Sequence, residues 1–198
     1  MVEKNIVLNG LHGRPVLLDH FHGSTDKPLV IFSHGFKGFK DWGHFNYVAK
    51  EFQRKGLSFV KFNFSHNGGT VDQPIDFPDL EAFGNNNFTK ELDDLGIVID
   101  WCEKNISYSK LILLGHSRGG GITILKAAED KRVEKIITWA AVSNFKSRFP
   151  KDEILKWKND GVTYVTNTRT HQEMPLYFQL YDDLVCNEAR LDIEKASK

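Results

Sequence analysis

The sequence predicts an α/β fold with a mostly parallel, doubly wound sheet. Two apolar runs, at residues 28–33 and 110–114, are continuous rather than alternating in hydrophobicity, which is typical of strands buried on both faces, and a further strand is expected at 57–64. Stretches with helical spacing of apolar residues lie between these runs. Strands that alternate with helices in this way form parallel sheets with right-handed crossovers.

Composition limits the classes of protein to which the chain can belong. It has 198 residues, 40% hydrophobic and 26% charged, so we expect one folded core and no second independent one. Lys+Arg and Asp+Glu each number 26, so no net field favours nucleic acid or an anionic membrane as a partner. The sequence has no bilayer-length apolar run and no signal peptide. Two cysteines, Cys102 and Cys186, are too few for a disulfide framework, which indicates the cytoplasm.

The first expected element is an antiparallel strand pair at residues 6–8 and 16–18, separated by turn-forming residues that include Asn9-Gly10. His20 and His22 would share one face of the second strand. No cysteine or third clustered ligand accompanies them, so we expect solvent-facing histidines and no metal.

A strand, a helix and a second strand follow. The strand at 28–33 precedes a helix at 44–55, which has apolar residues on one face and Gly56 after its end. The strand at 57–64 leads into residues 65–87, which carry prolines and glycines without a period. A connection of this length is typical of a functional or mobile segment.

The core continues with a helix at 89–105, the strand at 110–114, a third helix that includes Ile122, and a strand at 133–142. These elements complete a βαβαβ alternation.

The pattern changes at Asn144, where aromatic and charged residues begin to interleave and no fully apolar strand follows. No linker precedes this change. We therefore predict two units: residues 1–143 as the N-terminal part of the core, and residues 144–198 as a cap-like or lid-like insert.

The motif Gly115-His116-Ser117-Arg118-Gly119 matches G-x-S-x-G and lies between a predicted strand and a predicted helix. This context is the one that a nucleophile elbow requires. The serine of an elbow occupies a sharp turn, and side chains in place of the glycines would collide with the strand and helix. We predict Ser117 as the catalytic nucleophile, with Gly115, His116 and Gly119 supporting the turn. The alternative is an ordinary helix N-cap serine.

A second motif, His34-Gly35-Phe36, follows the strand at 28–33. Acyl transfer needs two backbone N–H groups aimed at the developing oxyanion, one after the nucleophile and one in the loop after an earlier strand. We predict that Phe36 and Arg118 supply them, with His34 and Gly35 supporting the loop. The alternatives are a simple strand-ending turn at His34-Gly35 and a surface charge for the Arg118 guanidinium.

The segments PLVIFSHGFKGFKDW, FVKFNFSHNGGT and LILLGHSRGGG give the chain, from about Asn5 to Val142, a resemblance to the α/β-hydrolase superfamily. It resembles most the bacterial dienelactone-hydrolase and acylaminoacyl-peptidase-like serine hydrolases. The resemblance implies hydrolysis of a carboxylic ester or a related small acyl substrate, with Ser117 as nucleophile, Phe36 and Arg118 as oxyanion donors, and no metal or organic cofactor. Where the dienelactone hydrolases use cysteine, this sequence has serine.

The base and the acid of a catalytic triad follow the nucleophile along the chain in this fold. His171 is the only histidine after Ser117, and residues 144–170 contain no convincing pair of further core strands. We expect His171 to be solvated rather than to act as the base. The resemblance places the missing partners on strands after the cap, so we expect a C-terminally truncated core that lacks its last strands, and self-association through the exposed sheet edge.

Two functions of different class remain open. The first is a serine hydrolase of small acyl substrates, of which a peptidase is a variant, because acyl-enzyme chemistry does not separate ester from amide. The second is a catalytically inactive α/β-hydrolase-like protein that binds or assembles through its sheet edge and aromatic cap.

Overall fold

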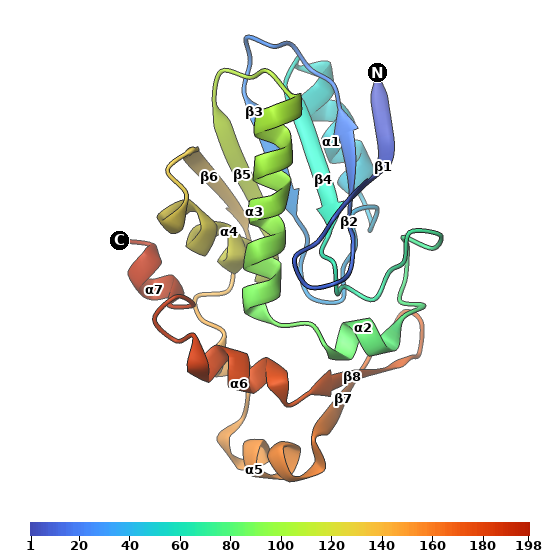
Figure 1. The fold of residues 1–198 in the computed structure, drawn as a ribbon, viewed down its shortest axis with the longest axis vertical. Coiled ribbons are helices and arrows are strands. Elements are labelled where there is room, and N and C mark those ends of the chain that lie inside the picture. Colours follow the sequence, from blue (N-terminus) through green and yellow to red (C-terminus); the bar gives the residue numbers. More distant parts are fainter.

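A six-stranded sheet forms the centre of the computed structural model, which describes residues 1–198 (Figure 1). The strands lie in the order β1-β2-β4-β3-β5-β6. The last four in this order pair in parallel, whereas β1 with β2 and β2 with β4 are antiparallel. The predicted fold class and its N-terminal antiparallel pair are confirmed. The bounds are β1 (Val2–Leu8), β2 (Val16–Phe21), β3 (Leu29–Ser33), β4 (Ser58–Asn63), β5 (Leu111–His116) and β6 (Val133–Trp139).

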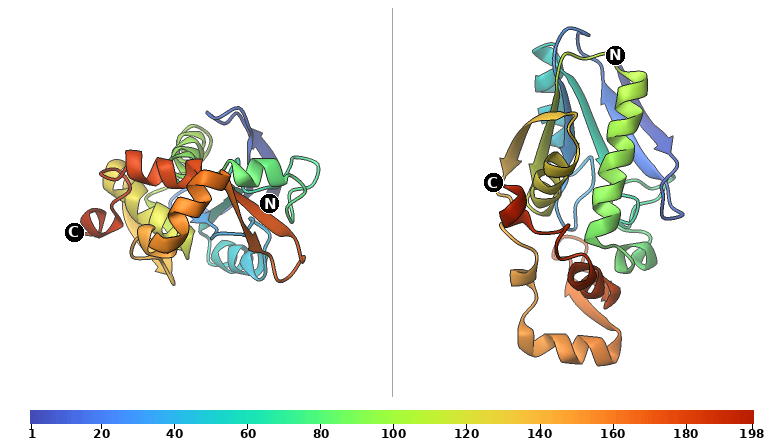
Figure 2. Two further views of the ribbon diagram at one scale, coloured as in Figure 1. Left: turned by 90° about the horizontal axis from the view of Figure 1, so that it is seen from below. Right: turned by 60° about the vertical axis from the view of Figure 1, so that its left-hand side comes forward.

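Helices cover both faces of this sheet, as Figures 1 and 2 show. In β3, Val30 and Phe32 pack in a small core with α1. Leu29 and Ile31 point the other way, into the larger core with α3 and α4. Alternate residues of one strand thus enter opposite cores, which is why its sequence is apolar throughout. The helices are α1 (Phe45–Arg54), α3 (Phe88–Asn105) and α4 (Arg118–Glu129).

The strand order reverses at β3. The chain passes from β3 to β4 on one side and later returns to β5 on the other side. The carboxyl ends of β3 and β5 are therefore neighbours, and they open the crevice where α/β sheets bind ligands.

The connection after β4 contains a short helix, α2 (Leu80–Gly84), within the segment predicted to lack regular structure. The Asp79 side chain caps it by accepting from the Ala82 N–H at 2.8 Å. At α3, the Asn87 side chain accepts from the Lys90 N–H at 2.9 Å. A helix as short as α2 is too brief to produce a visible 3.6-residue period, so its cap is the only sequence signal.

Residues 144–198 lie below the carboxyl ends of the parallel strands in Figure 1, and Figure 2 shows them from two other sides. They contain a two-stranded sheet of their own. The Trp157 indole donates to the Leu176 carbonyl at 2.7 Å and joins the helix of this segment to that sheet. We propose this segment as the cap on the 1–143 core. Its elements are η1 (Lys146–Arg148), α5 (Lys151–Asp160), β7 (Val162–Thr166), β8 (Glu173–Tyr177), α6 (Gln179–Cys186) and α7 (Ile193–Ala196).

β6 is an edge strand, because it pairs with β5 alone. It ends at Trp139 rather than at Val142, since Ala140 adopts a left-handed backbone with φ of 48°. Ile136, Ile137 and Trp139 are 37–42% exposed on it. Among residues 1–198, β6 is the last strand of the main sheet on this side.

Four charged side chains, three of them buried and one half-buried, fix the loop after β3. Lys61 of β4 donates to Asp19 and to Asp41 at 2.6 Å each, and Lys40 approaches the same two carboxylates at 2.9 and 2.6 Å. Burial opposes ionisation of Asp41, but hydrogen bonds from Lys40 and Lys61 lower its pKa well below the usual range. Two positive and two negative charges balance, and they tie the loop that carries Lys40 and Asp41 to β2 and β4.

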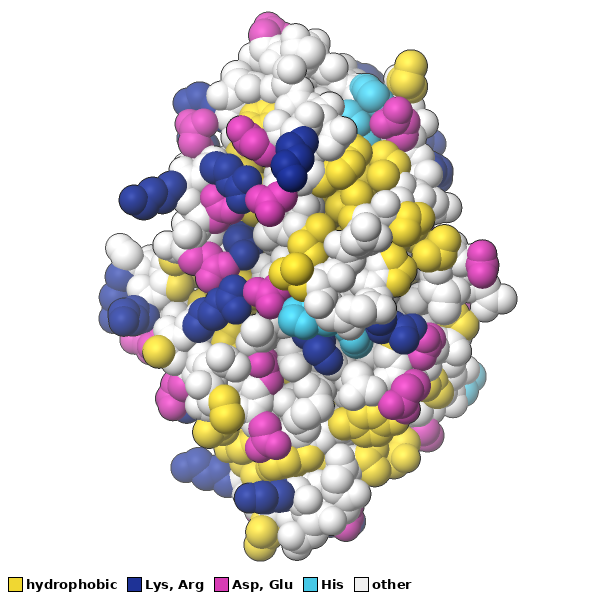
Figure 3. Space-filling model, in the orientation of Figure 1, with side chains coloured by type: hydrophobic (Ala, Val, Ile, Leu, Met, Phe, Trp, Pro, Cys, Tyr) yellow, Lys and Arg dark blue, Asp and Glu magenta, His cyan; other side chains and the backbone are white.

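Charges of both signs are scattered over the face of the molecule in Figure 3, as the balanced composition predicts. None of the helices combines the length and the apolar character that a bilayer span requires.

Candidate active site

Ser117 occupies a strained turn between β5 and α4. Its backbone has φ of 54° and ψ of −118°, which is uncommon for a residue with a side chain and typical of a strained functional turn. Its N–H donates to the Trp139 carbonyl at 2.8 Å, and its carbonyl accepts from Gly120 at 3.0 Å. Ser117 stands at the N-cap position of α4, yet its hydroxyl makes no capping hydrogen bond. The turn therefore presents the hydroxyl rather than using it to cap the helix.

The glycines around Ser117 permit close packing of backbone on backbone. A Cβ at Gly119 would overlap the carbonyl oxygens of Ser33 and His34, and one at Gly115 would overlap Gly119 and Thr123. α4 therefore approaches the ends of β3 and β5 more closely than side chains would allow. The physical reason given for the glycines of the motif holds in the structure.

The two predicted motifs meet at the crevice. A Cβ on Gly35 would lie 3.1 Å from the Ser117 Cβ, so the loop after β3 is in contact with the turn after β5. The backbone N–H groups of Phe36 and Arg118 donate to no acceptor in the loops and caps around them. Two unpaired donors beside one serine are what an oxyanion hole needs.

His34 holds this loop through its ring. The ring Nδ1 donates to the Gly35 carbonyl at 2.9 Å, and Nε2 accepts from the Phe64 N–H at 3.4 Å. Burial lowers the pKa of His34 to about 4, so the imidazole is neutral at pH 7. With both nitrogens occupied, His34 connects β3 to β4 and is not free to act as a base.

His116 lies beside the same contact. It is half-buried, its ring packs 6.0 Å from the Phe45 ring between centroids, and burial lowers its pKa. A Cβ on Gly35 would lie 3.2 Å from its Nδ1. The ring therefore flanks the loop after β3 on the side of α1.

The Arg118 guanidinium is buried, which rules out the surface-charge alternative. Its Nη2 lies 2.9 Å from Glu91 Oε1 and its Nε donates to Oε2 at 3.0 Å. The guanidinium carbon lies 4.5 Å from the Phe88 ring centroid and 5.4 Å from that of Phe36. Burial raises the pKa of Glu91, although the adjacent Arg118 and a hydrogen bond from Asn86 oppose this. The ion pair anchors α4 to α3.

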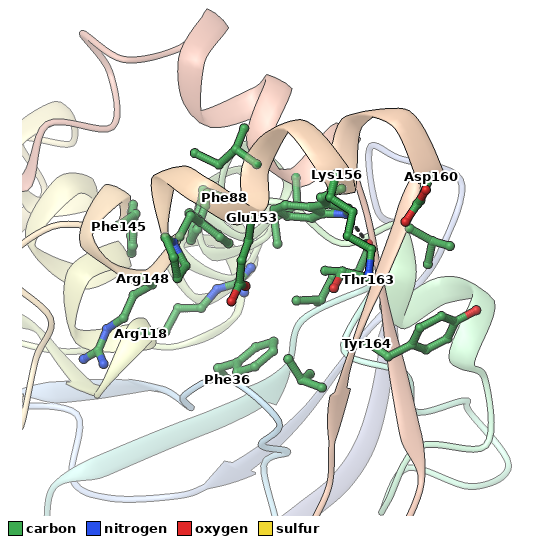
Figure 4. A pocket seen from close by; sticks show the side chains of 18 of the residues that line it. Phe36, Phe88, Arg118, Phe145, Arg148, Glu153, Lys156, Asp160, Thr163 and Tyr164 are labelled. Atoms are coloured by element: carbon green, nitrogen blue, oxygen red, sulfur yellow. Dashed lines mark hydrogen bonds between the residues drawn. The ribbon is translucent and has the colours of Figure 1, made fainter.

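A cavity of about 910 Å³ opens between this turn and the cap (Figure 4). Its lining includes Ser117, Phe36 and Arg118 from the core. Most of the rest comes from the proposed cap, and Figure 4 shows Phe145, Arg148, Glu153, Lys156 and Tyr164 around it. Apolar and aromatic side chains predominate in the lining, which is the usual character of a small-molecule site.

The other histidines do not line the cavity. His171 lies in the turn between β7 and β8, exposed, with φ of 57°. The Gln172 side chain ties this turn to the Phe77 carbonyl at 3.1 Å, and His171 does not line the cavity. His66 does not line it either, and its Nδ1 lies 2.8 Å from the Ser65 hydroxyl. No histidine ring or carboxylate hydrogen-bonds to the Ser117 hydroxyl.

Glu91 is a site residue that the sequence motifs do not reveal. It lies on the buried face of α3 with Phe88, Leu92 and Leu95, at the i, i+3, i+4 and i+7 positions. A carboxylate within an apolar stripe signals a buried cation, because an unpaired buried charge is costly. The pattern shows that Glu91 needs a cationic partner, but it does not identify Arg118 as that partner.

Comparison with known proteins decides the family. Residues 24–175 match the family model described as serine aminopeptidase, S33. The chain belongs to this family. The resemblance to α/β hydrolases drawn from the three sequence segments is thereby confirmed.

One curated relative of this S33 family member comes from Mycoplasma pneumoniae and is described as an esterase/lipase. The two are 28% identical over 127 residues, which is 63% of this chain and 42% of the relative. The match therefore spans about two fifths of the length of that relative.

Solved structures share the fold. The DcsB protein, solved in complex with its substrate analogue, has a TM-score of 0.73 and 16% identity, and the match covers 98% of this chain and 77% of that one. A dienelactone hydrolase from Anabaena variabilis has a TM-score of 0.59 and 18% identity, covering 71% of this chain and 63% of that one. The S33 family member thus has the α/β-hydrolase fold.

Proposed function

We propose that this chain is a serine hydrolase of carboxylic esters or related small acyl substrates, with Ser117 as nucleophile. The observation that carries the proposal is the left-handed backbone of Ser117 at the end of β5, in contact with the loop at Gly35. Strain of this kind persists only where the surrounding structure holds it, and it concentrates at functional sites. Membership of a hydrolase family and the esterase/lipase relative support the same reaction class.

The proposed mechanism is acyl transfer in two steps. The Ser117 hydroxyl attacks the substrate carbonyl while a base takes its proton, and the leaving group departs with a proton. The oxyanion accepts hydrogen bonds from the N–H groups of Phe36 and Arg118. Water then attacks the acyl-enzyme and releases the acid. The scheme uses neither a metal nor an organic cofactor.

We propose that the base and the acid of the triad do not lie among residues 1–198. His34 has both ring nitrogens engaged, and His171 lies in a hairpin turn outside the cavity. Without its base, a triad enzyme retains only the catalysis that comes from the oxyanion hole and from binding, about 10³ to 10⁴ over water. We therefore expect weak, serine-dependent turnover from these residues alone.

The cavity favours an apolar or aromatic acyl group. Phe36, Phe145, Phe149 and Trp157 line it, and the Arg118 charge is already neutralised by Glu91. The family description names an aminopeptidase, and the carboxylate of Glu153 in the lining suits a substrate ammonium group. A peptidase of the same mechanism is therefore the second candidate.

A non-catalytic role in binding or assembly is the alternative from a different class. β6 has an unpaired edge and exposes Ile136, Ile137 and Trp139. Edges of this kind pair with other strands, so self-association through β6 belongs to this proposal. We also propose a cytoplasmic location, because the free thiols of Cys102 and Cys186 fit a reducing compartment.

The test is hydrolysis of p-nitrophenyl butyrate and of an aminoacyl p-nitroanilide by the wild type, Ser117→Ala and Ser143→Ala. Ser143 is an exposed serine near the cavity and serves as the matched control. We expect slow hydrolysis of the ester, lost in Ser117→Ala and unchanged in Ser143→Ala. Faster turnover of the anilide supports the peptidase. A Ser117→Ala protein as active as the wild type contradicts Ser117 as nucleophile, and no turnover by the wild type supports the binding role.

A further inference from the structure

A second cluster of reactive side chains lies at the opposite end of the sheet from Ser117. Glu3 of β1, with His20 of β2 and its neighbour His22, brings one ligand atom from each residue to within 4.8 Å of the others. Phe21 of β2 pairs with Phe59 at the amino end of β4, whereas Ser117 follows the carboxyl end of β5. We propose that Glu3, His20 and His22 form a binding site for a divalent transition metal of the zinc type.

A β-bulge creates the cluster. Glu3 pairs with His20 and Ile6 pairs with Leu18, and the register shifts between these two pairs. In an unshifted ladder, Lys4 would face His20, and Glu3 would lie on the opposite face of the sheet. Asn5 makes the shift with φ of 56°, and its N–H donates to Asp19 at 2.9 Å. The bulge thus brings Glu3, rather than Lys4, opposite His20 and beside the two histidines.

The distances fit metal coordination. Glu3 Oε2 lies 3.2 Å from His22 Nε2 and 3.7 Å from His20 Nδ1. Metal–ligand bonds of about 2.0–2.1 Å in a tetrahedron separate neighbouring ligand atoms by about 3.3 Å. The two separations bracket this value. Two histidines and one carboxylate are also a known zinc ligand set.

The side chains are positioned without satisfying one another. The Nε2 atom of His22, the ring nitrogen that lies nearest Glu3, is buried and has no hydrogen-bond partner. The rings stack with centroids 4.0 Å apart, and the edge of the Trp101 ring packs against His20, which fixes their orientation.

The site is open to solvent on one side. The Glu3 side chain is 49% exposed and that of His22 is 35% exposed, which leaves an open side for an ion and a water. Near the amino terminus, histidine and acidic side chains lie together on the surface (Figure 3).

The sequence shows two of these ligands and not the third. His20 and His22 share a strand face, but Glu3 reaches them only through strand pairing with a bulge. The expectation of no metal rested on the absence of a third ligand, which the structure supplies.

The test is titration of untagged, chelator-treated protein with Zn²⁺ by calorimetry, and with Co²⁺ by visible absorption. We expect one Zn²⁺ per chain and a tetrahedral Co²⁺ spectrum. Glu3→Gln and His22→Gln, both at partly exposed positions, should weaken Zn²⁺ binding more than about tenfold. The matched control is His44→Gln, an exposed histidine that makes no capping hydrogen bond, and it should bind like the wild type.

Circular dichroism of each variant shows whether it is folded. Ser117→Ala should bind Zn²⁺ like the wild type, so this site is tested independently of the proposed hydrolase activity. The proposal is overturned if the wild type binds no Zn²⁺, or if Glu3→Gln and His22→Gln bind it as tightly as the wild type. Equal losses in His44→Gln would show general adsorption to surface histidines and would also overturn it.

Discussion

At the scale of single residues, the ion pair between Arg118 and Glu91 connects the proposed oxyanion loop to the rest of the core. Arg118 follows Ser117 directly, and its guanidinium lies between the Phe36 and Phe88 rings and pairs with Glu91. Removing one partner of a buried pair leaves the other charge uncompensated. Stability and site geometry therefore depend on the same contact.

We predict that Glu91→Gln lowers the free energy of unfolding by about 3–5 kcal/mol, the usual cost of breaking a buried pair. The matched control on the same helix is Glu103→Gln, an exposed position, for which we expect a change within about 0.5 kcal/mol. Urea unfolding followed by circular dichroism measures both. Equal values for the two variants would show that the buried pair contributes nothing.

At the scale of elements, the approach of α4 to the ends of β3 and β5 positions Ser117. Two helical glycines, Gly119 and Gly96, show how this close approach differs from ordinary helix packing. A Cβ on Gly119 would overlap backbone oxygens, whereas one on Gly96 of α3 would meet only the flexible end of Lys126, at 3.2 Å. Backbone atoms cannot move aside, whereas the flexible end of a lysine side chain can.

We predict opposite effects for Gly119→Ala and Gly96→Ala. Gly119→Ala forces α4 away from β3, lowers the melting temperature and abolishes serine-dependent ester hydrolysis. Gly96→Ala gains about 0.5–1 kcal/mol in helix propensity with little steric cost, so its melting temperature stays equal or rises. Thermal denaturation and ester assays of both variants check this. A normal melt and normal activity for Gly119→Ala would contradict the close approach.

The sequence predicted the core elements better than the cap. Continuous apolar runs at 28–33 and 110–114 identified β3 and β5, because a short run that is apolar throughout is typical of a strand buried on both faces. β7 and β8 escaped prediction because each is short and partly exposed, and their pairing depends on contacts with α2 and α5. The nucleophile turn was visible as a motif, whereas Glu91 and Glu3 needed the packing of helices and the register of strands.

At the scale of the whole molecule, buried titratable groups link stability to pH. Burial lowers the pKa values of His20, His34 and His66 to about 4 each, and burial raises that of Asp94 to about 7. Each histidine stabilises the folded state above its unfolded pKa of about 6.5, and this stability is lost as the pH falls towards 4. Asp94 acts in the opposite direction, because the folded state keeps its proton up to about pH 7.

We predict that three histidines outweigh one aspartate, so the melting temperature of metal-free protein falls from about pH 6.5 to about pH 4.5. Asp94→Asn removes the opposing group and keeps the acceptor for the Ser65 N–H, which lies 2.8 Å from Asp94 Oδ2. The fall should therefore be steeper in this variant. Differential scanning calorimetry over this pH range measures both, and a melting temperature that rises on acidification would contradict the prediction.

The most direct test of the central claim is labelling with a fluorophosphonate probe followed by peptide mapping. The proposed function predicts slow, single-site labelling at Ser117, absent in Ser117→Ala. It predicts unchanged labelling in His171→Ala, because His171 lies outside the cavity. Labelling of a different residue, or a wild type that does not react at all, would contradict Ser117 as the nucleophile.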